Sequence, residues 1–545
     1  MDGMSRRLAA AAIVAGLCWR LGAAWAPGDA AQTYAQPQEG YFLSSVVLLS
    51  RGVYSSDPGG APQTGRGPLF TSFLALSQAG ASRPSPRRAR VAQALLGALA
   101  ALAAWGLGAR LRSPLAGALA AALVSFDPRL VVAVRGLDVH GFYGVVILLL
   151  GCAAAHWAES RGDRRSSILL GLALGASFLT RSAHLAVLVL LPAAAWIWWK
   201  RHAGVVLLVA AAVLLPWTAR NYAHTGRFVP LDAGTGAYNL LAAADGGDLA
   251  LRYEEAFAVA DKHRPGFSAA HRDEPVERRD SAVMKLALAL IAERPADYAL
   301  GVLRRLRAFF LPLAVFLLPA LWAALAPGAS RGTRAAALVA ASFLAYGAVG
   351  LGEGYRLGLE PLLAALAGVG LAALFDARAK PSASALRAAF PAAGLIAVAA
   401  VLCLLLVPRD ALAARRAGRA DCEPPPAFLA AFLDDGVRLA GKDWYLAQWP
   451  GALRARPEVC AGMKAFAAGD AAEAATRFAA AAAAAPMDAS IRVSLAVALG
   501  ASGRKAQALR ECAAAESLAD ASAPSYEQKR LRDSIRSTRA GLEHR

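Results

Sequence analysis

Long apolar runs that recur through residues 1–407 are the feature that most constrains the fold of this chain. Apolar side chains make up 57% of its 545 residues. A single globular core cannot bury so many runs of this length, whereas helices in a lipid bilayer can. The sequence therefore predicts an all-α, polytopic membrane protein. About eleven spans are expected, at 8–25, 91–108, 115–134, 139–156, 167–181, 184–199, 203–219, 309–326, 335–350, 358–375 and 388–407.

Basic residues gather at alternate ends of these spans. Cytoplasmic loops carry the excess of lysine and arginine, so the basic loops predict the cytoplasmic face and an N-terminus inside the cell. The outer face then receives residues 27–90, the region around Asp138, the loop 216–307, the turn 353–356 and everything after residue 407. The formal net charge of +19 is attributed to topology and to anionic lipid, and no nucleic-acid partner is expected. The basic loops contain Arg110, Arg112, Arg161, Arg164, Arg165, Lys200, Arg201, Arg331, Arg334, Arg378, Lys380 and Arg387.

Two large outer loops interrupt the predicted transmembrane domain, residues 1–407. The first covers residues 27–90 and holds two short apolar segments, 41–50 and 68–76. Both are shorter than the ~20 residues that a span needs, and both fit juxtamembrane helices lying along the bilayer surface. The second outer loop covers residues 220–307.

The C-terminal part changes character after a break at residues 422–426. Residues 408–454 are expected to form a linker and capping helices, and residues 455–545 a small helical domain. Gly469 and Gly503 are 503 − 469 = 34 residues apart, which is the tetratricopeptide period. In an oxidising compartment, Cys422 and Cys460 would either form a disulfide or remain two free thiols. The pairs that keep the 34-residue phase are Ala474 with Ala508, Phe478 with Cys512, and Ala481 with Ala515.

Ionisable side chains at membrane depth are costly and tend to be functional. Glu39, Asp138, Arg181 and Arg356 each stand where a predicted helix meets the outer face. A carboxylate can take a proton from an acceptor hydroxyl, while arginine neutralises a phosphate. The alternative is that all four are interfacial charges paired with one another or with lipid headgroups. His140 is interpreted as a hydrogen-bonded structural histidine in preference to a ligand or proton carrier.

The segment that follows the span 203–219 adds Arg220, Asn221 and Tyr222, a cation, an amide and a phenol placed where a span meets water. This set suits binding of a phosphate or a sugar, and a well-capped loop at the membrane surface would have the same composition. No cofactor is implied. Metal dependence is left open, since two carboxylates can bind a divalent ion or act without one.

Over residues 8–375 the chain resembles the polyprenyl-phosphate-dependent GT-C membrane glycosyltransferases, which include the protein O-mannosyltransferases and the bacterial aminoarabinose transferases. The resemblance implies that Glu39 stands where the family has its catalytic aspartate, ahead of Tyr41 and a juxtamembrane helix. It also implies that Asp138 is the second acidic position and that Tyr41, Arg181 and Arg356 contact the donor. The motifs are EGYFLSSVVLLSRGVYSS (39–56), GRGPLFTSFLAL (65–76), FDPRLVVAVRGLDVHGFYG (126–144), FLTRSAHLAV (178–187), PWTARNY (216–222) with GRFVPL (226–231), and EGYRLGLEP (353–361).

The function that the resemblance implies is transfer of a sugar from a polyprenyl-phosphate donor to a glycan, lipid or protein acceptor at the outer face of the inner (plasma) membrane. The C-terminal domain would then be periplasmic and available to a protein partner. The alternative is a non-catalytic membrane scaffold that presents tetratricopeptide repeats for cell-envelope assembly. A secondary transporter is disfavoured because the charges gather at one face, whereas transporter sites lie near the bilayer midplane.

Overall fold

The structure is a computed structural model, and its described residues are all helix, turn or loop, with no β-strand among them. This part of the chain confirms the all-α fold class. The chain divides into two compact units, and each is described by itself. The first comprises residues 1–28, 63–79 and 85–408, and the second residues 29–62, 80–84 and 409–545. The described residues are 2–25, 39–55, 67–82, 84–161, 163–181, 202–231, 235–247, 253–271, 274, 276–326, 329–349, 354–375, 444–486, 488–520 and 526–543.

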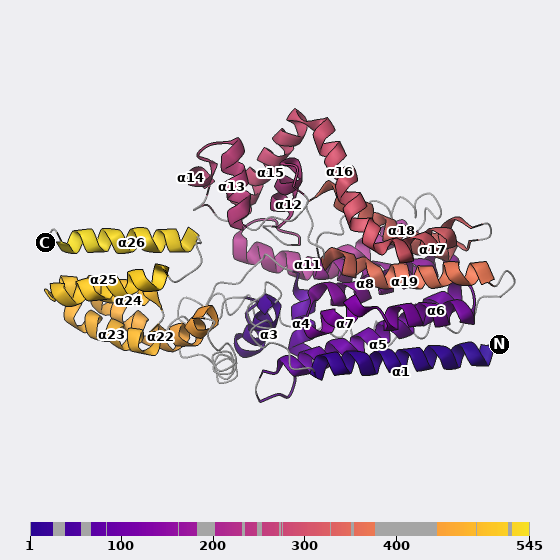
Figure 1. Ribbon diagram of the computed structural model, residues 1–545, viewed down its shortest axis with the longest axis horizontal. Coiled ribbons are helices and arrows are strands. Elements are labelled where there is room, and N and C mark those ends of the chain that lie inside the picture. The colour runs from indigo at the N-terminus through magenta and orange to yellow at the C-terminus, as the bar shows by residue number, and fades with distance from the viewer. Residues whose placement is uncertain are drawn as a thin grey trace. The chain divides into compact units, whose positions relative to one another are not determined.

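The first unit is a bundle of long apolar helices with a group of shorter helices beside it (Figure 1). Its helices are α1 (Asp2–Trp25), α4 (Pro68–Ser77), α5 (Pro86–Leu111), α6 (Pro114–Ser125), α7 (Pro128–Arg135), α8 (Val139–Glu159), α9 (Arg164–Thr180), α11 (Ala203–Thr225), α12 (Thr235–Ala244), α13 (Tyr253–His263), α14 (Phe267–His271), α15 (Val276–Glu293), α16 (Pro295–Phe310), η2 (Leu311–Leu313), α17 (Ala314–Leu325), α18 (Arg331–Ala341), η3 (Ser342–Ala348) and α19 (Gly354–Phe375).

Six helices in the described residues are long and apolar enough to cross a membrane, and a bent pair makes a seventh if it counts as one span. The pair is α6 with α7, bent by 44° at the break after Ser125. The predicted spans 184–199 and 388–407 lie outside the described residues, so the total of eleven stays a prediction. The six are Gly3–Trp25, Pro86–Leu111, Val139–Glu159, Ala203–Thr225, Pro295–Leu325 and Gly354–Leu374.

One of these spans begins earlier than its apolar run. The apolar stretch predicts a span at 309–326, but α16 starts at Pro295 and continues through η2 into α17. The sequence prediction places residues 295–307 in the outer loop because the arginines of α16 give this stretch the composition of a polar loop. Arg305 is buried, and its Nε donates to the Gly347 carbonyl at 2.8 Å, whereas Leu300 and Leu303 face outward.

Small residues bring the helices of the bundle close together. At Gly108 a Cβ would stand 2.7 Å from the Ala116 carbonyl oxygen, and at Gly368 it would stand 2.5 Å from the Ala120 nitrogen. These two glycines let α5 and α19 approach the backbone of α6. Close backbone approach through small residues is how membrane helices gain packing energy in lipid. The alanine and glycine content of the apolar runs is therefore a packing requirement.

A buried arginine explains how the chain tolerates the break between α6 and α7. The last carbonyls of a helix have no partner within the helix. Arg20 of α1 donates from Nη1 to the Ser125 carbonyl at 2.9 Å and from Nη2 to the Val124 carbonyl at 2.6 Å. Asp127 then starts α7 by accepting from the Arg129 amide at 2.9 Å. Arg20, which interrupts the first apolar run, therefore caps another helix.

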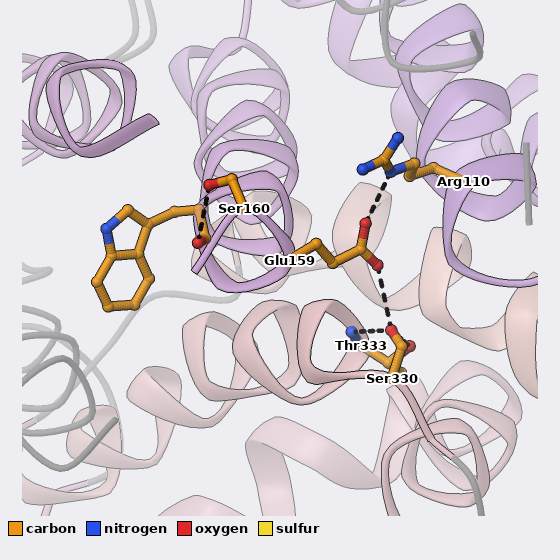
Figure 2. Close-up of polar contacts among 6 residues, drawn as sticks. Arg110, Glu159, Ser160, Ser330 and Thr333 are labelled. Atoms are coloured by element: carbon orange, nitrogen blue, oxygen red, sulfur yellow. Dashed lines mark hydrogen bonds and ion pairs between the residues drawn. The ribbon is translucent and has the colours of Figure 1, made fainter. Parts of the chain in front are cut away.

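Figure 2 shows the C-terminal end of α8, where three helices are joined by polar contacts. Glu159 Oε2 accepts from Arg110 Nε of α5 at 2.7 Å, and Oε1 accepts from Ser330 Oγ at 3.4 Å. Ser330 also caps α18 by accepting from the Thr333 amide at 3.0 Å. These ends adjoin three of the loops that the basic pattern places on one face, and the structure brings these three together. Which compartment this face meets stays a prediction.

The predicted outer loop 220–307 contains a small helical module with its own core. Tyr238 and Leu241 of α12, Phe257 of α13, Phe267 of α14 and Val283 of α15 form a buried cluster. We call α12 to α15 the loop module; α16 leads from it back to the bundle (Figure 1).

The second unit contains α3 (Glu39–Arg51), α22 (Trp444–Ala467), α23 (Ala471–Ala484), α24 (Ala489–Ala501), α25 (Lys505–Asp520) and α26 (Tyr526–Glu543). The starts of α23 and α25 are 505 − 471 = 34 residues apart, and Gly469 and Gly503 both have a positive φ (86° and 80°) in the turns before them. All six residues of the predicted phase pairs are buried. Cys512 is a free buried thiol, and Cys460 is disulfide-bonded. Cys422 lies outside the described residues, so its pairing with Cys460 stays a prediction.

Candidate active site

A tight turn between α7 and α8 positions Asp138. Leu137 adopts a left-handed conformation with φ 51°, which is unusual for a residue with a branched side chain. The Asp138 amide returns to the Ala133 carbonyl at 2.9 Å, and its own carbonyl accepts from Gln93 Nε2 of α5 at 2.9 Å. Asp138 is thereby fixed as the N-cap of α8, at the end opposite Glu159.

The Asp138 carboxylate is the first member of a polar chain that crosses three helices. Its Oδ1 accepts from the His140 amide and from His140 Nδ1, both at 2.8 Å. His140 Nε2 lies 3.2 Å from Arg181 Nη2, and Arg181 Nη1 donates to the Tyr355 hydroxyl at 3.4 Å. Because arginine can only donate, Nε2 must accept, which leaves the imidazole proton on Nδ1 facing Asp138.

Aromatic rings from α19 and η3 pack against this chain of polar side chains. The ring of Tyr355 packs edge-on against His140 at 4.9 Å and carries the Arg181 guanidinium over its face at 5.2 Å. Tyr346 packs on Tyr355 at 5.3 Å, and its hydroxyl lies 3.3 Å from that of Tyr143. Gly354 makes room for the imidazole, since a Cβ there would stand 2.5 Å from His140 Nδ1. We call Asp138, His140, Arg181 and Tyr355 the Asp138 network.

The electrostatics of the network keep Asp138 ionised. Burial would raise the pKa of the Asp138 carboxyl, but the hydrogen bonds from His140 and the nearby charge of Arg181 outweigh it, and the pKa lies below its usual value. The side chain is 21% exposed, and among the described residues no hydrogen bond or ion pair uses Oδ2. One carboxylate oxygen is therefore held in place while the other remains available to a ligand.

The other predicted residues stand in three places, on α19, on α3 and at the end of α11. Arg356 lies in the first turn of α19, beside Tyr355 and half-buried. Glu39 opens α3, with a side chain outside the described part, and Tyr41 of the same helix is buried. Because α3 belongs to the second unit, the structure does not place Glu39 or Tyr41 relative to Asp138.

Three predicted donor-binding residues stand at the end of α11. Asn221 Nδ2 donates to the Val229 and Leu231 carbonyls at 3.0 and 3.2 Å, and Trp217 Nε1 donates to the Leu231 carbonyl at 2.7 Å. Arg220 is buried over the Trp217 ring at 4.6 Å, whereas Tyr222 is 58% exposed. The motif PWTARNY thus fastens the segment that follows α11, and any role in donor binding stays a prediction.

A second polar cluster escaped the sequence interpretation. Glu360 of α19 is fully buried, and its Oε1 lies 2.9 Å from Arg129 Nη1 of α7. Asp127 shares the same arginine, with its Oδ1 3.5 Å from Arg129 Nε. The signal was present, because Glu360 is an acid inside an apolar run. Its partner lies more than 200 residues away in the chain. For metal binding, no cluster of three or more potential protein ligands occurs among the described residues.

Comparison with known proteins identifies no family. No family model and no curated protein matches the chain. Among solved structures, the oligosaccharyltransferase of the archaeon Archaeoglobus fulgidus in its apo form aligns with a TM-score of 0.41 and 15% identity, over 73% of this chain and 56% of that one. Its complex with zinc and sulfate gives 0.39 and 15%, over 73% and 53%. The oligosaccharyltransferase AglB of the same organism, with an inhibitory peptide and a dolichol-phosphate, gives 0.38 and 15%, over 74% and 56%. The chain therefore matches little more than half of each of these structures.

Proposed function

We propose that this chain is a GT-C-type membrane glycosyltransferase that transfers a sugar from a polyprenyl-phosphate donor to an acceptor at the face where the Asp138 network lies. The observation that carries the proposal is the network itself. An ionised carboxylate, a histidine of defined tautomer and an arginine meet at one end of the membrane helices. These are the groups that a reaction between a hydroxyl and a phosphate-linked sugar requires.

In the proposed mechanism, Asp138 orients a hydroxyl of the acceptor or the sugar through Oδ2, while Oδ1 stays bound to His140. Arg181 stands behind His140 and faces the donor phosphate, whose developing negative charge it stabilises. Glu39 takes the acceptor proton, the role implied by its position in the motif EGYFLSS. The acceptor oxygen then displaces the lipid phosphate at the anomeric carbon with inversion. Tyr41, Arg220, Asn221, Tyr222 and Arg356 complete the proposed donor site.

The proposal includes the eleven spans, an inner-membrane location with the Asp138 face outside, and the domains at 1–407, 408–454 and 455–545. It also assigns the C-terminal helices to the tetratricopeptide class. Support for that class comes from the 34-residue spacing of α23 and α25 and from the buried phase pairs. We infer that these helices recruit a glycan or protein acceptor. The scaffold alternative keeps this recruiting role without catalysis.

The test is transfer by purified enzyme from polyprenyl-phosphate-linked sugars, with the acceptor class taken from mass spectrometry of envelope glycans in a deletion strain. Asp138→Asn should lower the rate by a factor on the order of 10², as for loss of a group that positions a reactant. Asp163→Asn is the matched control, because Asp163 also caps a membrane helix, accepting from the Ser166 amide at 2.7 Å. No transfer by the unmodified protein from any donor would support the scaffold, and equal loss in both variants would remove Asp138 from the mechanism.

A further inference from the structure

A cationic groove lies in the loop module, outside the Asp138 network. Its volume is 830 Å³, within the usual range for a small-molecule site. Basic side chains of Arg227, Arg264, Arg278 and Lys285 line it. The one described carboxylate in the lining, Glu274, is already bound to His271 Nδ1 at 3.1 Å. The described lining therefore carries a clear excess of positive charge.

Local structure explains why these charges converge. Arg278, Ser281 and Lys285 form a stripe along α15, and the opposite side of that helix, with Val283 and Ala287, is buried in the module core. A turn through Gly266, with φ 82°, brings Arg264 to the same groove. The groove is also apolar in part, with lining from Phe267, Ala270, Ala282, Leu286 and Ala289.

The groove begins where the chain leaves the membrane. Arg227 stands two residues after the end of α11, a helix that is long and apolar enough to span a bilayer. Its neighbours Tyr222 and Phe228 are 58% and 77% exposed. Exposed aromatic residues at the end of a span are typical of the headgroup region of a bilayer. The charged wall thus starts at the depth of lipid phosphates.

We propose that this groove binds the headgroup of an anionic phospholipid, with the phosphate among the four basic side chains and the glycerol end on the apolar lining. An acidic peptide fits less well, because Ser281 and His271 are the only polar side chains without a formal charge in the described lining, and His271 is already bound to Glu274. Arginine and lysine are the residues that bind lipid phosphates at membrane surfaces. The proposal is independent of the glycosyltransferase activity.

The test measures binding of dihexanoyl-phosphatidylglycerol to the full-length protein in detergent by native mass spectrometry. One variant carries glutamine at the four lining positions 227, 264, 278 and 285. A matched variant loses four exposed cations of the C-terminal helices, Lys464, Arg504, Arg510 and Arg536. If the four charges act independently, the first variant should bind on the order of 10³-fold more weakly, and the second should stay within about threefold.

Three competitors identify the source of the ligand. Dihexanoyl-phosphatidylcholine should bind at least tenfold more weakly, and glycerol phosphate and hexaglutamate should not displace the lipid at equal concentration. Equal binding of phosphatidylcholine, or displacement by either soluble anion, would overturn the assignment to an anionic lipid. Equal losses in the two four-residue variants would overturn the assignment to the groove.

A single substitution at Lys285 tests the groove without the risk that the four-residue variant fails to fold. Lys285 is exposed on α15, so its replacement leaves the module core intact. Lys285→Glu should weaken phosphatidylglycerol binding tenfold or more, and Lys285→Arg should retain it, with circular dichroism unchanged in both. Full binding by the glutamate variant contradicts the proposal even if the four-residue variant fails to fold.

Discussion

The two ends of α8 use the same kinds of side chain in different ways. At the C-terminal end, Glu159 has Arg110 on one oxygen and Ser330 on the other. At the N-terminal end, Asp138 makes both of its side-chain hydrogen bonds through Oδ1, to the backbone and ring of His140. The two carboxylates are similarly exposed, at 19% and 21%. Solvent exposure therefore does not distinguish the two carboxylates. They differ in how many of their oxygens accept hydrogen bonds.

This difference distinguishes a structural ion pair from a candidate active site. Both carboxylate oxygens of Glu159 already accept hydrogen bonds, so neither is available to a substrate. The role of Glu159 is to join α5, α8 and α18. Asp138 is oriented by hydrogen bonds to one carboxylate oxygen, and its other oxygen remains available to a substrate. The 21 residues of α8 separate these ends by about 30 Å, so each can be altered without disturbing the other.

The sidedness of these two ends gives the largest expected effect. A phosphatase fused after Val407 should be active, and one fused at Arg164, beyond the Glu159 end, should be inactive, because the basic loops keep that end in the cytoplasm. Alkaline phosphatase activity in whole cells measures this directly. The reverse pattern would place the Asp138 network inside the cell and contradict the proposed outer acceptor.

Glu39→Gln should abolish transfer, with a fall on the order of 10²–10⁴ if Glu39 is the base. Glu159→Gln is the matched control and should keep the rate within about threefold. Initial rates with a saturating lipid-linked donor provide the measurement, and labelling of the protein in membranes checks insertion. Near-normal transfer by the Glu39→Gln variant would exclude Glu39 as the base.

His140→Ala should lower transfer about 10- to 100-fold and change its pH dependence. The side-chain hydrogen bond of His140 helps to hold the pKa of Asp138 below its usual value, so the loss of this bond should raise that pKa, while the bond from the backbone amide remains. Activity that needs ionised Asp138 should then disappear at a higher pH as the solution is acidified. His140→Asn retains a side-chain donor and should recover part of the shift. An unchanged acidic limb in the alanine variant would show that His140 does not act through Asp138.

The smallest effects are expected at the C-terminal end of α8, around Glu159, which we call the closed end. Glu159→Gln should cost about 1 kcal/mol of stability, because the pair with Arg110 is partly exposed. Gly332→Ala should cost about 1–3 kcal/mol, since its Cβ would stand 2.7 Å from Glu159 Oε1 and 2.9 Å from Leu111 Cδ2. Thermal unfolding in detergent measures both. If either variant lost transfer without losing stability, the closed end would also be functional.

Much of the architecture is predictable because its causes are local. A helix in lipid must be apolar over a fixed length, so runs such as 139–156 reveal their spans. A repeat must bury equivalent positions, so the 34-residue phase predicts the burial of Ala474 and Ala508. Alternating basic loops also predict that the ends near Arg110 and Ser330 lie together, and in the structure Glu159 contacts both residues.

Contacts between distant segments could not be predicted in this way. Asp138 and Arg181 were singled out by type, but the placement of His140 between them depends on how α8 and the end of α9 meet α19. The pairing of Glu360 with Arg129 likewise depends on the packing of α7 against α19. Helix α16 was missed because Arg304 and Arg305, which donate to carbonyls at the end of α12, resemble loop residues in sequence.

Arg20 also has a consequence for the order of synthesis. The carbonyls that it caps lie 104 and 105 residues later in the chain. At 5–20 residues per second, the ribosome needs roughly 5–20 s to supply them. During that interval the first helix carries a charge that is costly in lipid and has not yet met its partners. Helix α1 should therefore remain beside the insertion machinery until α6 arrives. Photocrosslinks from residue 20 to that machinery should persist until α6 emerges from the ribosome, and should end sooner in Arg20→Leu.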